Sequence, residues 1–85
     1  MSDLPVISLH ASGDVLTGKG EQWSIRAERE GRCSARTAVK VGGVLVADVT
    51  IHAGHQDDLS DEVQAVAAAL VWSALRAINA REGGA

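Results

Sequence analysis

The sequence predicts an α+β fold of two layers, in which a three-stranded antiparallel sheet is covered on one face by one long C-terminal helix. Residues 22–52 contain three segments in which apolar and polar side chains alternate, the period of half-buried strands. Residues 60–81 instead repeat apolar side chains at helical spacing. Short glycine-containing connections join the strands, so the predicted order is βββα.

The length of 85 residues allows one small domain. We expect residues 22–85 to form this domain and residues 1–21 to be a partly ordered N-terminal segment or an extra strand. The hydrophobic share of 46% comes mainly from Ala and Val, with two Trp and no Phe or Tyr, so the core should be thin. A chain of this size buries only about 60 to 65% of its unfolded surface, and a partner subunit would add stability.

The N-terminal segment is the part that the sequence describes least. Pro5–Leu9 is a short apolar run that leaves open a fourth strand or a packed tail. Gly13–Gly20 (GDVLTGKG) nearly matches a phosphate-binding loop, but Gly20 replaces the hydroxyl residue that would hold magnesium. Because a strand rather than a helix is predicted to follow, we expect turns here and no nucleotide site.

Each of the three predicted strands has one apolar face. The inward residues are Trp23, Ile25 and Ala27 in the first strand; Cys33, Ala35, Thr37 and Val39 in the second; and Leu45, Ala47, Val49 and Ile51 in the third.

The first connection can be tested by register, since a shift of one residue moves a whole apolar set to the wrong face. A two-residue loop would mix apolar and charged faces. A three-residue loop, Arg29–Gly31, keeps the faces apart and pairs Ile25 with Ala35. It places Gly31 where a type I turn with a bulge requires a left-handed residue.

The same reasoning favours a three-residue second loop, Val41–Gly43, over Gly42–Gly43 alone. It pairs Val39 with Leu45 and gives Gly43 the left-handed position. Both loops therefore predict an antiparallel meander whose apolar face needs a cover.

The predicted helix, from Ser60 to about Arg81, supplies that cover. Ser60 is the expected N-cap, Asp61 and Glu62 complement the positive end of the helix dipole, and Gly83–Gly84 should end the helix. Ala53–Leu59 should be a loop. The apolar stripe comprises Val63, Val66, Ala67, Leu70, Val71, Ala74, Leu75 and Ile78.

Trp72 lies nearly opposite this stripe, at about 100° per residue. One hypothesis makes it the centre of an interface, most simply in a two-fold dimer. The interface residues would be Trp72, Ala65, Ala68, Ala69 and Arg76. The alternative is that the N-terminal segment covers Trp72, with Leu4, Val6, Ile7 and Leu9 as candidates.

His52 and His55 form the one pattern that suits a metal, with Asp57, Asp58 and Cys33 nearby. The three ligand types do not converge in the predicted sheet, because Cys33 points inward and His52 outward. We therefore expect no metal site, and a small metal-binding protein that uses His52 and His55 is the last alternative function. Cys33 should be a small buried hydrophobic residue. No nucleophile and base arrangement is recognisable, and we expect neither an enzyme nor a cofactor.

Charge is unevenly distributed along a chain of net charge −3. The basic residues Arg26, Arg32, Arg36 and Lys40 should share the sheet face away from the helix, which suggests nucleic-acid binding as an alternative function, although this face lacks aromatic residues for stacking. Residues 41–75 contain no Lys or Arg and five acids. Within them, Asp57, Asp58, Asp61 and Glu62 are either a complement to the helix dipole or a patch for a basic protein surface.

These features favour a small non-catalytic protein-binding module over an enzyme. It would form a homodimer through the helix face and regulate or inhibit a partner by covering its surface. A phage anti-defence protein of the anti-CRISPR kind is one concrete version, suggested by small size, acidity and the lack of catalytic motifs. Without a secretion signal or an uninterrupted membrane span, the protein is expected to be soluble and cytoplasmic.

Overall fold

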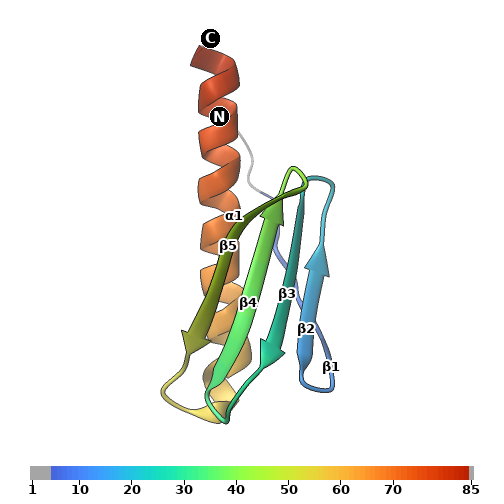
Figure 1. Cartoon of the computed structure of the whole chain (residues 1–85), viewed down its shortest axis with the longest axis vertical. Helices are drawn as coiled ribbons and strands as arrows, with labels where there is room; N and C mark the ends of the chain where they lie inside the picture. Colours follow the sequence, from blue (N-terminus) through green and yellow to red (C-terminus); the bar gives the residue numbers. More distant parts are fainter. Residues whose placement is uncertain (1–4, 85) are drawn as a thin grey trace.

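The computed structural model describes residues 5–84 and the side chains of residues 5–81. It confirms an α+β fold with an antiparallel sheet and one long C-terminal helix (Figure 1), but the sheet has five strands rather than three or four. The elements are β1 (His10–Ser12), β2 (Val15–Lys19), β3 (Trp23–Arg29), β4 (Ser34–Val41), β5 (Val44–His52), the short 3₁₀ helix η1 (Gln56–Asp58) and α1 (Leu59–Gly84).

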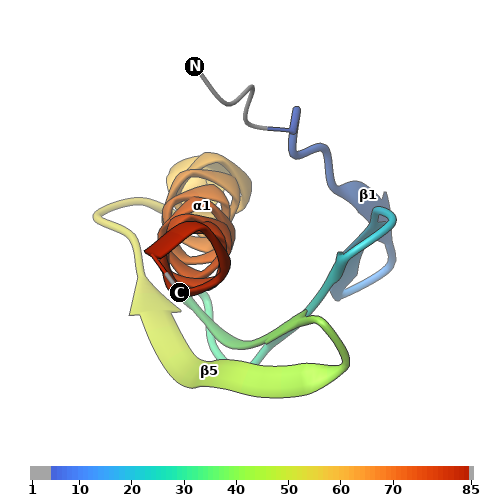
Figure 2. The same ribbon diagram turned by 90° about the horizontal axis from the view of Figure 1, so that it is seen from above.

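Every strand pairs with the next one along the chain, so the sheet order is β1-β2-β3-β4-β5, with β1 and β5 at the edges. The sheet curves around the helix, as seen along the helix axis in Figure 2. Helix α1 packs mainly on β4 and β5. The N-terminal segment, residues 5–9, lies on the side of the helix away from β5. It covers the part of the concave sheet face that the helix leaves open.

The first two strands form a hairpin that the sequence did not predict. Gly13, with a φ of 61°, lies in its turn, and β2 then pairs along its whole length with β3. The segment that resembles a phosphate-binding loop is therefore a turn and a strand, with no helix after it. Pro5–Leu9 forms no strand, because β1 begins only at His10.

The β3–β4 hairpin has the predicted faces but not the predicted register. Ile25 pairs with Val39 rather than with Ala35, a shift that keeps the parity of the two strands. The loop is also longer, and Gly31 does not have a positive φ. The Glu30 and Gly31 N–H groups both donate to the Ser34 carbonyl, at 3.0 and 3.3 Å, and this closes the loop without a left-handed residue.

The β4–β5 hairpin has the turn that the register reasoning rejected. Gly42 and Gly43 form a two-residue turn with φ of 63° and 80°, as a type I′ turn requires. A β-bulge then restores the parity, since the pairing passes from Lys40–Leu45 to Val39–Ala47 and skips Val46. Leu45 consequently lies opposite Lys40 on the outer face, and not on the inner face as predicted.

The core lies between the sheet and the helix stripe. The predicted inward residues of β3 and β4 are buried apart from Cys33, which is half-buried, whereas Val49 of β5 and Ile78 of α1 remain exposed. The buried apolar residues of the core are Ile7, Trp23, Ile25, Ala27, Ala35, Val39, Val41, Ile51, Leu59, Val63, Ala67, Ala68, Val71 and Leu75.

The helix begins and ends differently from the prediction. The loop before it contains η1, whose N-cap is His55: the Asp57 N–H donates to His55 Nδ1 at 3.1 Å. Helix α1 begins at the buried Leu59 and continues through Gly83 to Gly84. The stretch Gln56–Arg81 is long and apolar enough to cross a membrane. Core helices of water-soluble proteins meet the same criteria of length and composition.

Candidate functional site

Trp72 is half-buried beneath the N-terminal segment. Its indole N–H donates to the Pro5 carbonyl at 2.9 Å, and its ring packs against the core cluster that contains Ile7 and Trp23. A partly buried tryptophan needs such an acceptor for its single N–H. The sequence left open whether a second subunit or the N-terminal segment covers Trp72. In the structure, the N-terminal segment contacts it.

The segment does not cover the helix face completely. A groove of about 560 Å³ remains between Pro5–Ile7 and α1, and we call it the Trp72 groove. Its walls are Pro5, Val6 and Ile7 on one side and Asp61, Gln64, Ala65, Ala68 and Trp72 on the other. Most of these side chains are apolar, and Val6 is 85% exposed, so the groove presents apolar surface to the outside.

The alanines on this face of the helix give the groove its depth. Ala68 is buried at 6% exposure and Ala65 is exposed, and neither has atoms beyond Cβ that would fill the space beside Trp72. Ala69 and Arg76 were assigned to the same interface from the sequence. Both are exposed, but neither lines the groove.

One end of the groove is acidic. Asp61 lines it, and Glu62 follows in the first turn of α1. Asp57 and Asp58 belong to η1, directly before the helix, and all four carboxylates are exposed. Asp57 Oδ2 also lies 3.6 Å from His55 Nδ1. The four acids thus surround the positive end of the helix dipole and extend from there to the groove.

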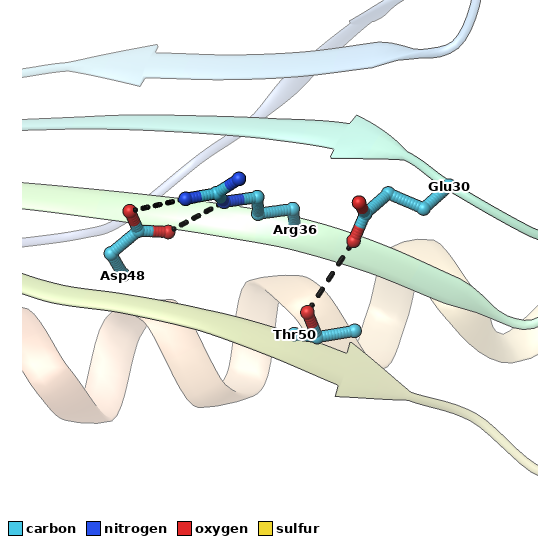
Figure 3. Close-up of polar contacts among 4 residues, drawn as sticks. All are labelled: Glu30, Arg36, Asp48 and Thr50. Carbon is cyan, nitrogen blue, oxygen red and sulfur yellow. Dashed lines mark hydrogen bonds and ion pairs between the residues drawn. The ribbon is translucent and has the colours of Figure 1, made fainter.

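The outer face of the sheet is less basic than its sequence suggests. Arg36 donates from Nε and Nη2 to the two carboxylate oxygens of Asp48, each at 3.0 Å (Figure 3). This hydrogen bonding lowers the pKa of the Asp48 carboxyl and raises the pKa of Arg36. Two residues further along β5, the Thr50 hydroxyl donates to a carboxylate oxygen of Glu30 at 3.4 Å.

The remaining cations of the predicted basic face are dispersed. Arg26 and Lys40 are exposed on the outer face, whereas Arg32 lies in the β3–β4 loop, where its carbonyl accepts a hydrogen bond from Arg29 at 3.0 Å. A hollow of about 330 Å³ on this face is lined by side chains of both signs and by no aromatic residue: Arg26, Glu28, Arg29, Glu30, Arg36, Ala38 and Asp48.

The two histidines and the cysteine that the sequence singled out have different surroundings. His52 is exposed on β5, and His55 is engaged as the cap of η1. Cys33 was predicted to lie in a strand and to point inward. It instead lies in the β3–β4 loop and is only half-buried. Within residues 5–84, no group of three or more His, Cys, Asp or Glu side chains is placed to hold an ion.

The sequence reasoning named the N-terminal wall of the groove only as an alternative, with Leu4, Val6, Ile7 and Leu9 as candidates. Val6 and Ile7 do line the groove, whereas Leu4 lies outside the described residues. Pro5 and Trp72 are separated by 67 residues, and no local pattern predicts their hydrogen bond. The signal for this wall was the apolar run Pro5–Leu9, which the sequence left open as a fourth strand or a packed tail.

Fold and site together define a small α+β protein with an apolar groove beside its helix. Comparisons of the chain with protein-family models, with curated proteins and with solved structures give no match. The function must therefore be argued from the surface alone.

Proposed function

We propose that this protein is a non-catalytic protein-binding module that holds its partner in the Trp72 groove. The observation that carries the proposal is an open apolar groove of about 560 Å³ with a tryptophan in its wall. That volume lies within the range of about 300 to 1,000 Å³ that is typical of small-molecule pockets, so the groove is large enough to receive an apolar side chain of a partner. Tryptophan is also enriched in binding hot spots, which lie in well-packed and desolvated pockets.

The charges around the groove specify the kind of partner. Asp61 lies in the wall, and Asp57, Asp58 and Glu62 are close to it in the chain. We therefore expect a partner segment in which an apolar anchor is flanked by Lys or Arg. Such segments occur on surfaces built to bind nucleic acid, so the module would act as a regulator or inhibitor by covering one. A phage-encoded anti-defence protein of the anti-CRISPR kind remains the most concrete version of this proposal.

The test compares two substitutions on the same helix. Ala65→Arg places a long cationic side chain in the groove, whereas Ala69→Arg adds the same side chain at an exposed position outside it. Random peptides displayed on phage provide a defined probe. We expect wild-type and Ala69→Arg protein to enrich peptides with an apolar residue flanked by Lys or Arg, and Ala65→Arg to lose at least about tenfold in affinity for them.

Two results would contradict this function. Equal binding by the Ala65→Arg and Ala69→Arg proteins would remove the groove from the interface. Enrichment of acidic or purely polar peptides would show that the partner chemistry is wrong.

Nucleic-acid binding is the second candidate, and one observation favours it. Lys19, Ser24 and Lys40 lie in one row across β2, β3 and β4, so two cations occur close together near one end of the outer face. Against it, Arg36 is neutralised by Asp48, and the net charge is −3. Titration with DNA and RNA oligonucleotides at low salt decides between the candidates, since phosphate contacts give an affinity that falls steeply with salt. A salt-dependent affinity that is lost in Lys40→Glu would favour nucleic acid.

A further inference from the structure

β5 is an edge strand whose outer backbone groups could pair with another strand. β5 is the longest strand, with nine residues, whereas the opposite edge strand β1 has three. Exposed edges in monomeric proteins are normally protected by Lys, Pro, inward-pointing charges or β-bulges. β5 carries no Lys, Pro or inward-pointing charge, its one acid, Asp48, is held by Arg36, and its bulge at Val46 leaves residues 47–52 regularly paired with β4. Its apolar side chains Val44, Leu45, Val46 and Val49 are between 41 and 62% exposed.

The backbone groups on this edge can be assigned from one hydrogen bond. The Ala53 N–H donates to the Cys33 carbonyl at 2.8 Å, so the pair of residues 33 and 53 is a hydrogen-bonded one. Antiparallel ladders alternate hydrogen-bonded and non-hydrogen-bonded pairs. Since Ser34 pairs with His52, the N–H and C=O groups of Asp48, Thr50 and His52 therefore point away from β4, toward the open edge.

Charge selects one register for pairing with a second β5. The outward groups of Asp48, Thr50 and His52 must face one another, and the bulge at Val46 ends the regular edge. A two-fold axis at Asp48 would place two carboxylates opposite each other, which is destabilising. An axis at Val49 pairs Asp48 with Thr50, and an axis at Ile51 pairs Thr50 with His52, so neither places His52 opposite Asp48.

An axis at Thr50 gives complementary pairs throughout. Asp48 then lies opposite His52, Thr50 opposite Thr50, and Val49 opposite Ile51. An imidazole N–H can donate a hydrogen bond to a facing carboxylate, and facing threonines can hydrogen-bond to each other, so these cross-strand pairs are stabilising; the facing Val and Ile side chains pack together.

We propose that β5 pairs antiparallel with β5 of a second copy of this chain, with Thr50 on the two-fold axis, so that two five-stranded sheets become one continuous sheet. This pairing satisfies the open backbone groups and covers the exposed Val49. It differs from the dimer expected at the helix face, where the N-terminal segment lies. It also leaves the Trp72 groove open and does not depend on the function proposed for that groove.

The test is the dissociation constant of the dimer, measured by analytical ultracentrifugation. Thr50→Pro removes an N–H that points to the open edge and that β4 does not use, so the fold should be kept. Because two backbone hydrogen bonds are lost in each dimer, we expect the dissociation constant to rise at least about tenfold. Thr50→Ala keeps the N–H and is the matched control, which should still form the dimer.

Two further measurements keep the proposal testable if Thr50→Pro does not fold. His52→Glu places one carboxylate opposite each Asp48 and should also raise the dissociation constant about tenfold. In the wild-type protein, the amide protons of Asp48, Thr50 and His52 should exchange more slowly as the protein concentration rises.

Several outcomes would overturn the proposal. One is a monomer at concentrations of several hundred micromolar; another is a dimer that Thr50→Pro and His52→Glu leave unchanged. A dimer that Ala65→Arg dissociates would place the contact at the helix instead. Slow exchange of the three amides only when a peptide partner is added would show that the edge takes another chain. Loss of peptide binding in Ala65→Arg with the dimer intact would leave this inference standing.

Discussion

Thr37 is the residue least suited to its surroundings. It lies in β4 between Ala27 and Val49, is fully buried, and within the described part of the chain its Oγ1 atom has no hydrogen-bond partner. An unsatisfied buried hydroxyl costs about 1 to 3 kcal/mol. Valine has the same shape and no polar atom to desolvate.

We therefore expect Thr37→Val to raise the free energy of unfolding by about 1 kcal/mol, measured by urea denaturation. Thr17→Val is the control, because Thr17 is exposed in β2 and should change stability by less than about 0.5 kcal/mol. A loss of stability in Thr37→Val would mean that the hydroxyl has a partner after all.

The β4–β5 turn makes the most specific demand on backbone conformation. Gly42 and Gly43 have φ of 63° and 80°, a region in which a side chain clashes with its own backbone. An alanine there costs about 1 to 2 kcal/mol. Gly43→Ala should lower the free energy of unfolding by this amount.

Gly54→Ala is the matched control for this prediction, because Gly54 has no positive φ and an added Cβ would meet no atom within 4 Å. Urea denaturation of the two variants makes the comparison. Equal effects would show that the turn does not depend on left-handed backbone.

Local pattern was sufficient for some elements and insufficient for others. It placed β3, β4, β5 and α1 and the inward faces of β3 and β4, because side-chain period depends only on neighbouring residues. It failed at both registers. In the β4–β5 hairpin, one unpaired residue, Val46, reverses the parity on which the turn prediction rested; in the β3–β4 hairpin, the shift keeps the parity, so side-chain alternation cannot reveal it. It missed β1 and β2 because three and five residues with few apolar side chains carry almost no periodic signal.

Only part of the candidate site could be predicted from the sequence, because helical spacing is local and the contact with Pro5 is not. The helix wheel identified Trp72 as a large side chain on the wrong face, together with Ala65 and Ala68 of the groove wall. What lies on Trp72 depends on a tertiary contact with Pro5, which no spacing encodes. The position of Trp72 on the helix therefore predicted part of the groove wall, but it could not decide between a second subunit and the N-terminal segment as its cover.

At the scale of the whole molecule, the N-terminal segment acts as part of the core rather than as a tail. Ile7 is 4% exposed and belongs to the cluster of Trp23, Ile25 and Val71. Packing is also close at Gly18, where an added Cβ would lie 2.7 Å from both the Ser8 carbonyl oxygen and the Leu9 side chain. The segment thus closes the side of the two-layer fold that α1 leaves open.

This role predicts a large difference between two adjacent residues. Ile7→Ala removes buried methyl and methylene groups and should lower the free energy of unfolding by about 2 to 5 kcal/mol. Val6→Ala truncates a side chain that is 85% exposed and should change it by less than about 0.5 kcal/mol. Both are measured by urea denaturation with tryptophan fluorescence, since Trp23 and Trp72 pack in the cluster that contains Ile7. If Ile7→Ala is as stable as Val6→Ala, the segment is not part of the core, and the Trp72 groove loses the wall that defines it.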